Sequence, residues 1–298
     1  MTRADPSRPI LLFGARGQVG QALAPRLGAI GPVIGLDRSS ADLTRPNTLR
    51  AIVRAANPWL VVNAAAYTAV DAAEADEATC LRVNAESPGI LAEEAALLGA
   101  PIVHYSTNYV FDGFLDRPYR EDDPASPTSV YGRTKLLGEA AVAANPAHLI
   151  LRLAAVYAST GRNFMQRILE LGREREELRV VQDQLVAPTP ASVVAEATAG
   201  IVGGLIDGTN ELRSGIYHLT CSGSTSWYGF AERILALDPR REEQRARRLV
   251  PVSSAEFAAA AARPLNGRLD CGRVAREFGV TLPFWESELE RVLTGRTP

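Results

Sequence analysis

Tyr131 and Lys135 are four residues apart, the spacing that places two side chains on one face of a helix. A phenol can donate a proton to a carbonyl oxygen, and a nearby ammonium group favours the phenolate and so lowers the pKa of the tyrosine. An earlier apolar stretch ends in Ser106 and Thr107, which deliver a hydroxyl ahead of this pair. We therefore predict proton donation to a carbonyl oxygen during hydride addition. Because a single Tyr-x-x-x-Lys pattern is common by chance, the prediction depends on the elements around it.

A glycine-bearing turn near the start of the chain has the composition of a phosphate-binding turn. It runs from Gly14 to Gly20, between an apolar run at 10–13 and a helical stretch at 21–27. Glycines in this setting allow a tight turn and close approach of the backbone to a pyrophosphate, and the helix N-terminus presents unpaired N–H groups to the phosphates. The turn predicts dinucleotide binding through Gly14, Gly17, Gln18, Val19 and Gly20.

Asp37 and Arg38 follow the second apolar run, at 33–36. A carboxylate at this place can accept hydrogen bonds from the adenosine ribose of NAD, whereas an arginine can pair with the 2′-phosphate of NADP. Both residue types are present, so the position predicts NADPH or NADH and does not choose between them. The alternative that one or both are solvent-facing loop residues stays open.

The elements between these motifs alternate regularly. Short apolar runs at 10–13, 33–36, 59–62, 101–106 and 148–152 are typical of parallel strands buried on both faces. Helical stretches separate them at 21–27, 47–56, 73–98 and 131–144. Alternation with short loops predicts an α/β fold, a doubly wound parallel Rossmann-type sheet with right-handed crossovers.

After residue 152 the alternation weakens. We expect helices at 164–178 and 191–206, a strand at 215–219 and an exposed arginine-rich segment at 239–248. Residues 10–152 are thus predicted to form an NAD(P)-binding Rossmann domain that also takes back about 188–212. Residues 153–298 are predicted to form mainly a smaller, discontinuous C-terminal substrate-binding lobe.

Composition excludes several classes of protein. The 298 residues carry a formal net charge of -2, so no basic excess favours nucleic acid. No apolar run reaches the roughly 18 residues of a membrane span, and we expect a cytoplasmic protein without a membrane partner. The three cysteines are too scattered for a disulfide framework or a metal site and are expected to be small buried side chains: Cys80, Cys221 and Cys271.

A glycine-rich turn, a hydroxyl, a tyrosine and a lysine in this order are what short-chain dehydrogenases use. From about Ile10 to Leu293 the chain resembles the dTDP-4-dehydrorhamnose reductases of the extended short-chain dehydrogenase/reductase family. The matching stretches are Leu11–Gly14 with Gly17–Gly20, Val62–Ala66 with Thr68–Asp71, His104–Thr107, Tyr109–Phe111, Ser126–Pro127, Val130–Gly132 with Thr134–Lys135, Asp183–Gln184, Ala187–Thr189, Gly215–Leu219, and Arg263–Pro264 with Asn266.

The resemblance implies reduction of the C4 keto group of dTDP-6-deoxy-L-lyxo-4-hexulose to dTDP-L-rhamnose, a precursor of cell-surface polysaccharide. Tyr131 would be the general acid, Lys135 would hold the nicotinamide ribose and adjust Tyr131, and Thr107 would hydrogen-bond the sugar 4-oxygen. Cofactor contacts would come from Gly17, Gln18 and Val19 at the pyrophosphate, Asp37 at the adenosine ribose, Asp42 and Leu43 at the adenine, and Ala66, Tyr67 and Thr68 after the third strand. Substrate contacts would come from Thr107, Asn108, Val70, Ala155, Arg263 and Asn266.

The chain departs from the family pattern at four places. Asn108 replaces an aspartate, Ala155 replaces a tryptophan, and Asn266-Gly267 stands where the family has Asn-Ser. Some members bind magnesium through glutamates at a dimer interface, but one of those positions matches Ala22, so no metal is expected. A homodimer is left open.

Two alternatives to this function remain. The first is a related sugar-nucleotide reductase or epimerase with another substrate, which the changes at Asn108 and Ala155 favour. The second is a non-catalytic relative such as the regulatory subunit of methionine adenosyltransferase, which shares the fold and binds a nucleotide cofactor. The intact pair Tyr131 and Lys135 argues against the second, because a binding module has no use for a proton donor beside an ammonium group.

Overall fold

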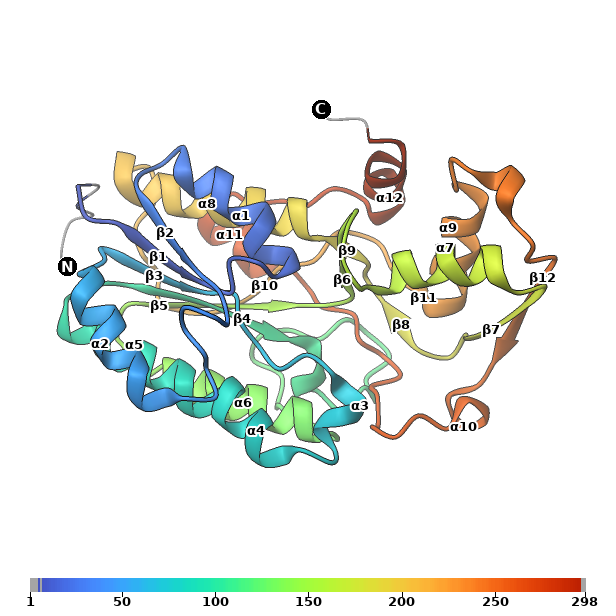
Figure 1. Cartoon of the computed structure of the whole chain (residues 1–298), viewed down its shortest axis with the longest axis horizontal. Coiled ribbons are helices and arrows are strands. Elements are labelled where there is room, and N and C mark those ends of the chain that lie inside the picture. The colour runs from blue at the N-terminus through green and yellow to red at the C-terminus, as the bar shows by residue number, and fades with distance from the viewer. Residues whose placement is uncertain (1–4, 6, 296–298) are drawn as a thin grey trace.

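The computed structural model describes residue 5 and residues 7–295 of the chain. Residues 1–4, 6 and 296–298 lie outside it, and the last three belong to the lobe predicted over 153–298. The described part contains a six-stranded parallel sheet in the order β10-β5-β4-β3-β1-β2 (Figure 1). Its strands are β1 (Ile10–Phe13), β2 (Val33–Leu36), β3 (Leu60–Asn63), β4 (Ile102–Thr107), β5 (His148–Leu153) and β10 (Gly215–His218). The predicted α/β class and Rossmann-type parallel sheet are confirmed.

Helices cover both faces of this sheet (Figure 1). One face carries α1 (Gln18–Gly28), α8 (Ala191–Asp207) and α11 (Gly272–Phe278), and the other carries α2 (Pro46–Ala56), α5 (Ser87–Leu97) and α6 (Val130–Val142). Leu12 lies in the core under the first face and Leu11 in the core under the second, because successive strand residues point to opposite sides. An apolar run such as 10–13 is therefore buried at every position.

The chain returns to the sheet after residue 152 in more than one place. The return expected around 188–212 corresponds to α8, which packs against α1. The strand expected at 215–219 is β10, which pairs with β5 at the edge of the sheet. α11 adds Val274 and Phe278 to the same core. The segment that follows residue 152 thus supplies one strand and two helices to the sheet layer.

The second lobe packs around a core of its own. α7 (Phe164–Glu174), α9 (Trp227–Ala236) and α12 (Trp285–Thr294) contribute side chains around Phe230, which is fully buried. Two parallel strands, β7 (Glu177–Val181) and β12 (Arg248–Val252), lie at the end of this lobe that is remote from the sheet (Figure 1). Its smaller elements are β6 (Val156–Tyr157), β8 (Leu185–Val186), β9 (Thr189–Pro190), β11 (Thr225–Ser226), η3 (Arg241–Glu243) and α10 (Ser254–Phe257).

Two expected helices were wrong in detail. The stretch 164–178 does not stay helical, because α7 ends at Glu174 and β7 follows. In β7, buried Leu178 and Val180 alternate with exposed Glu177 and Arg179. A period of two marks a strand, but the charged residues before it are good helix formers and hide the boundary.

The arginine-rich segment 239–248 is mostly exposed, as expected. Cys80 and Cys221 are buried as expected, whereas Cys271 is half-buried.

The stretch 73–98 is likewise not one helix. It divides into α3 (Val70–Ala73), α4 (Glu77–Leu81), a π-helical turn η1 (Arg82–Glu86) and α5. The wider π turn carries the buried Asn84, whose Oδ1 accepts a hydrogen bond from the backbone N–H of Tyr67 at 2.9 Å and whose Nδ2 donates to the Tyr67 carbonyl at 3.2 Å. Single π turns inside α-helices are frequent at functional sites, and this one holds the segment that follows β3.

Polar side chains form a buried layer on the α6 side of the sheet, where the sequence predicts apolar strands. Residues on neighbouring strands lie opposite one another: Asn63 of β3 pairs with His104 of β4, and Arg152 of β5 pairs with Ser106 of β4 and His218 of β10. All five side chains are buried. Glu139 of α6 accepts hydrogen bonds from Arg152 at 2.8 and 2.7 Å and from the Ser106 hydroxyl at 2.5 Å. Arg152 also lies 5.0 Å from the centre of the Phe111 ring. This layer ties α6 to the carboxyl ends of β4 and β5.

The part of the chain that the structure describes lacks a membrane-spanning helix and a metal-binding cluster. No helix among the described residues is long and apolar enough to cross a membrane. Within the same residues, no group of three or more His, Cys, Asp or Glu side chains is arranged to hold a metal ion.

Glu139→Gln should destabilise the protein strongly, because it leaves the Arg152 guanidinium buried without a counter-charge. Breaking a buried pair in this way costs about 3–5 kcal/mol. The matched control is Glu170→Gln, which removes the exposed pair with Arg167 and should change stability by roughly 0–1 kcal/mol. Urea unfolding of the three proteins measures both values. Equal losses in the two variants would contradict a buried ionic layer.

Candidate active site

A cavity of about 900 Å³ lies at the carboxyl ends of the parallel strands. Its wall includes residues that directly follow β1, β2 and β3 and the last residues of β4 and β5, namely Gly14, Asp37, Ala64, Thr107 and Leu153. This is where open parallel sheets bind ligands, and the volume falls within the roughly 300–1,000 Å³ of typical small-molecule sites. The second lobe closes the cavity with Arg162, Asn163 and Trp227.

The glycine turn forms one end of the cavity. Gly14 has a φ of +77°, which L side chains rarely adopt, and α1 begins directly after Gly17. Gly14, Gly17, Gln18 and Val19 line the cavity as predicted, but Gly20 does not. A Cβ at Gly20 would overlap the carbonyl oxygen of Gly14, so this glycine allows α1 to pack on the turn. The structure thus gives Gly20 a packing role, and its contact with the cofactor stays a prediction.

The acidic residue after β2 is held by its neighbours. Asp37 accepts hydrogen bonds from the N–H and hydroxyl of Ser39 at 2.9 and 2.6 Å and pairs with Arg16 at 2.8 Å. Hydrogen bonds from Ser39 outweigh the opposing effect of desolvation and lower the pKa of Asp37 to about 2. The side chain of Arg38 is largely exposed and lies 3.9 Å from Asp42. Asp37, Arg38, Asp42 and Leu43 all line the cavity, so this end presents two carboxylates and a guanidinium.

The start of α6 brings Tyr131 to the opposite end of the cavity. Ser129 caps the helix, because its hydroxyl oxygen accepts the backbone N–H of Gly132 at 3.2 Å. A Cβ at Gly132 would overlap the carbonyl oxygen of Tyr109 in η2 (Asn108–Val110), so the glycine permits close approach of α6 to the end of β4. As a result the Tyr131 ring lies edge-on to Tyr109, with ring centres 5.5 Å apart.

The acid–base state of Tyr131 differs from the sequence-based expectation. We expected Lys135 to lower the pKa of the phenol, but burial raises the pKa of Tyr131, and a hydrogen bond with Thr107 offsets the rise only in part. The net direction is upward because the phenolate would lose its hydration in this enclosed place. A neutral phenol is the form that can donate a proton, so the shift favours an acid rather than a base.

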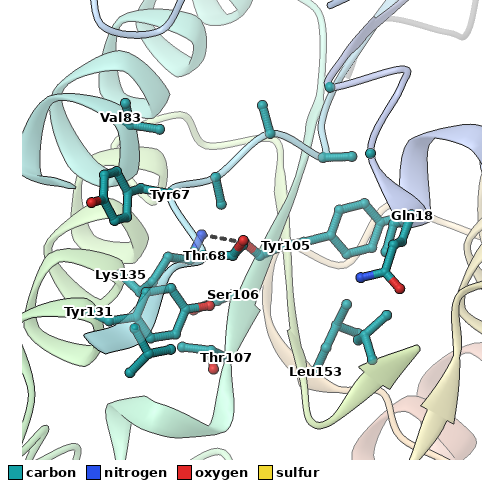
Figure 2. Close-up of a pocket in the computed structure, with 18 of the residues that line it drawn as sticks. Gln18, Tyr67, Thr68, Val83, Tyr105, Ser106, Thr107, Tyr131, Lys135 and Leu153 are labelled. Atoms are coloured by element: carbon teal, nitrogen blue, oxygen red, sulfur yellow. Dashed lines mark hydrogen bonds between the residues drawn. The ribbon is translucent and has the colours of Figure 1, made fainter. Parts of the chain in front are cut away.

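Lys135 is buried beneath Tyr131 and anchored to the sheet. Its Nζ donates to the carbonyl oxygen of Tyr105 at 2.6 Å, the bond drawn as a dashed line in Figure 2, and lies 3.2 Å from Nε2 of His104. Burial lowers the pKa of Lys135 to about 8, against an opposing effect of Glu139. Figure 2 shows Tyr131, Lys135 and Thr107 on one side of the pocket, facing Gln18 and Leu153. The three residues predicted to be catalytic are therefore brought together.

The residues predicted for the substrate divide into two groups. Val70, Asn108 and Ala155 line the cavity, as do Ala66, Tyr67 and Thr68 from the segment after β3. Arg263 and Asn266 do not line it. Arg263 pairs with Asp71 at 2.7 Å, and Asn266 donates to the carbonyl oxygens of Leu115 and Arg117, both at 2.7 Å. These two side chains hold loops beside the site, and their contact with substrate stays a prediction.

Other lining residues were not singled out from the sequence. Arg16 lies inside the glycine turn, and Thr79 lies in α4, where the sequence predicts uninterrupted helix. Arg162, Asn163 and Trp227 belong to the second lobe, whose segments show no regular alternation. The only sequence signal for Asn163 is its capping position before an amphipathic helix, where its Oδ1 accepts from the N–H of Gln166 at 3.1 Å.

Two departures from the family pattern contact each other in the structure. Asn108 Nδ2 donates to the carbonyl oxygen of Gly267 at 3.3 Å, and a Cβ at position 267 would overlap the same nitrogen. Asn108 thus fills space that a serine side chain at 267 would need. The structure thus brings these two departures from the family pattern into contact.

The single variants Asn108→Asp and Gly267→Ser should each destabilise the protein. The first places a carboxylate against the Gly267 carbonyl, and the second forces the new side chain onto Asn108. In the double variant the serine hydroxyl can donate to the carboxylate, so part of the loss should return. We expect a coupling energy of about 1 kcal/mol or more, within the roughly 0.5–3 kcal/mol found for residues in contact. Additive losses in urea unfolding would show that the two positions are independent.

Comparison with known proteins gives one consistent result. The family model described as "RmlD substrate binding domain" matches residues 8–297. The dTDP-4-dehydrorhamnose reductase of Burkholderia thailandensis is 45% identical over 282 residues, which cover 93% of this chain and 95% of that protein. The protein of the same name from Salmonella typhimurium is 40% identical over 293 residues, covering 96% of this chain and 97% of the relative.

Solved structures agree with the sequence comparison. The crystal structure of a dTDP-4-dehydrorhamnose reductase from Clostridium acetobutylicum has a TM-score of 0.88 and 34% identity, covering 96% of this chain and 98% of that one. A dTDP-4-dehydrorhamnose reductase from Bacillus anthracis, solved in complex with NADP, also has a TM-score of 0.88, with 30% identity and coverage of 97% and 100%.

Proposed function

The chain belongs to the dTDP-4-dehydrorhamnose reductase family, and from this premise we propose that it reduces the C4 keto group of dTDP-6-deoxy-L-lyxo-4-hexulose to give dTDP-L-rhamnose. It uses NADPH or NADH as the reductant. One observation carries the proposal: a single cavity holds a nucleotide-binding turn at one end and Tyr131, Thr107 and Lys135 at the other.

The residues of the cavity fit a nicotinamide dinucleotide. The turn at Gly14 and Gly17 offers space without side chains beside the N-terminus of α1, as a pyrophosphate requires. Gln18 Oε1 is buried and has no hydrogen-bond partner among the described residues, so a ligand donor can satisfy it. Asp37 and Arg38 directly follow β2, the position from which this type of fold contacts the adenosine ribose. When bound, the reduced nicotinamide supplies the hydride.

The chain's own residues handle the proton and the developing charge. Tyr131 is neutral in its buried place and gives its proton to the carbonyl oxygen as that oxygen becomes negative. The Thr107 hydroxyl hydrogen-bonds the same oxygen, so charge is stabilised where it forms. Lys135, one turn further along α6, is held by the Tyr105 carbonyl.

The second lobe provides groups suited to a nucleotide-activated sugar. Arg162 brings a cation, which suits a diphosphate, and Trp227 brings a flat apolar face, which suits a base or sugar ring. Ala155 adopts a positive φ of 44° in the cavity wall and leaves room where a tryptophan would stand in the family pattern. That room favours a second candidate, a reductase of a bulkier sugar nucleotide, and a panel of ketosugar nucleotides separates the two.

A cytoplasmic location and a homodimer belong to the same proposal. Sedimentation equilibrium of the full chain measures its assembly. The non-catalytic alternative has less support, because Tyr131 and Lys135 share one cavity and the phenol is held in its proton-donating form.

Tyr131→Phe should lower kcat about 10²–10⁴-fold with dTDP-6-deoxy-L-lyxo-4-hexulose, because the general acid is lost. The matched control is Tyr109→Phe, which removes the neighbouring phenolic hydroxyl and should keep most of the activity. NADPH oxidation measures turnover, and fluorescence titration of NADPH measures cofactor binding in each variant. Unchanged turnover in Tyr131→Phe would exclude this residue as the acid. Normal NADPH binding by the wild type without turnover would exclude this substrate.

Asp37→Ala should shift the preference from NADH toward NADPH. The pKa of Asp37 is about 2, so the carboxylate is ionised throughout the neutral range, where it accepts from a ribose hydroxyl and repels a 2′-phosphate. Losing one charge-assisted hydrogen bond to the ribose should raise KM for NADH about tenfold or more. Arg38→Gln is the opposite test and should raise KM for NADPH instead. A parallel change of both KM values in either variant would place these side chains away from the ribose.

A further inference from the structure

Lys135 contacts His104, and a hydrogen bond from Asn63 determines which ring nitrogen of His104 carries the proton. His104 and Asn63 lie side by side on β4 and β3, and all three side chains are buried. Asn63 Oδ1 accepts the backbone N–H of Ala65 at 3.1 Å, so its Nδ2 must face Nδ1 of His104, which lies 3.1 Å away. An amide nitrogen only donates, so His104 Nδ1 must accept.

This arrangement determines which proton points at the lysine. A neutral imidazole carries one N–H, and with Nδ1 accepting, that N–H is on Nε2. Burial holds the pKa of His104 well below its usual value, and the ring stays neutral. Its Nε2–H therefore points at Lys135 Nζ at 3.2 Å. A neutral amine can accept this hydrogen bond, whereas an ammonium group would set donor against donor.

We propose that His104, held in one tautomer by Asn63, is a positioning residue that disfavours the ammonium form of Lys135 and so sets the pH range over which Lys135 stays charged. This inference rests on the proposed function, in which Tyr131 is the acid and charged Lys135 supports it. The ammonium form of Lys135 donates to the Tyr105 carbonyl, and the neutral amine can accept the His104 N–H.

The groups that face Lys135 agree with this division of roles. β4 presents His104 and the Tyr105 carbonyl, α4 presents the Cys80 thiol, and α6 presents Glu139. Glu139 and Cys80 favour the charged lysine, but the Glu139 carboxylate is already bonded to Arg152 and Ser106. Burial and the His104 N–H oppose the charge.

The geometry has a further consequence for the cavity. Asn63 can present its oxygen to His104 only if it releases the N–H of Ala65. Ala65 belongs to segment 64–68, which lines the cavity after β3. The charge of Lys135 is thus tied to the backbone of the wall that borders the cofactor.

The first test reads the tautomer directly and needs no substrate. The chain has only three histidines, so ¹⁵N NMR of the imidazoles, assigned with single substitutions, resolves each ring. We expect the neutral Nε2–H tautomer for His104 throughout the neutral range. An Nδ1–H tautomer, or a ring that gains a proton in that range, would overturn the proposal whatever the enzyme reduces.

The second test measures the pH profile of kcat. Activity that needs charged Lys135 is present below the pKa of this group, about 8, and is lost as pH rises through it. In His104→Gln the carboxamide can turn its oxygen to the ammonium group. The pH at which kcat falls on the alkaline side, here called the alkaline limb, should therefore rise by about one unit, a tenfold shift in the ionisation constant. The matched control His218→Gln alters an equally buried histidine on β10 and should leave this alkaline limb in place. An unmoved limb in His104→Gln, or equal movement in both variants, would overturn the proposal.

Discussion

The hydrogen bond from the Lys135 ammonium group to the carbonyl oxygen of Tyr105 joins α6 to the central sheet. A lysine with 1% exposed surface is costly to bury without a partner for its charge, so this bond helps to determine where α6 can lie. Gly132 removes the side chain that would hold α6 away from η2, and Tyr131 follows in position. The site is therefore built from the buried lysine outward, with the phenol placed last.

The same constraint accounts for the polar layer under the carboxyl edge of the sheet. A charged or polar group that is buried there needs partners from its neighbours. Arg152 and Ser106 both bond the Glu139 carboxylate, and Asn63 connects His104 to the backbone at Ala65, whereas Nη1 of Arg152 and both ring nitrogens of His218 have no partner among the described residues. Such a layer has few alternative arrangements, which keeps the reacting groups in one geometry. The cost in desolvation is offset by the large apolar cores on both sides of the sheet.

Much of the fold could be predicted because its signals are local. The apolar runs, the glycine turn and the Tyr131–Lys135 spacing each lie within a few residues, and the structure joins them as the sequence indicates. The break of helix 73–98 could not be predicted, because the π turn depends on the Asn84 contacts with Tyr67 across the chain. The strand β7 was missed because its partner β12 lies about seventy residues away.

At the site, the sequence does not show which partners a side chain has. Arg263 and Asn266 carry groups that suit a ligand, and in the structure Asp71 and two loop carbonyls bind them. The contact of Asn108 with Gly267 joins residues far apart in sequence, so neither position alone reveals that the two changes belong together. The role of His104 depends on which way the Asn63 amide faces, which only the N–H of Ala65 decides.

The central claim is that one cavity delivers a hydride to the sugar C4 while Tyr131 protonates its oxygen. The most direct test uses NADPH in which both hydrogens at the nicotinamide C4 are deuterium. It is incubated with the full chain and dTDP-6-deoxy-L-lyxo-4-hexulose, and the product is analysed by NMR. We predict dTDP-L-rhamnose that carries one deuterium at C4 of the sugar. A product without that deuterium, with deuterium at another carbon, or with the opposite configuration at C4 would contradict the account.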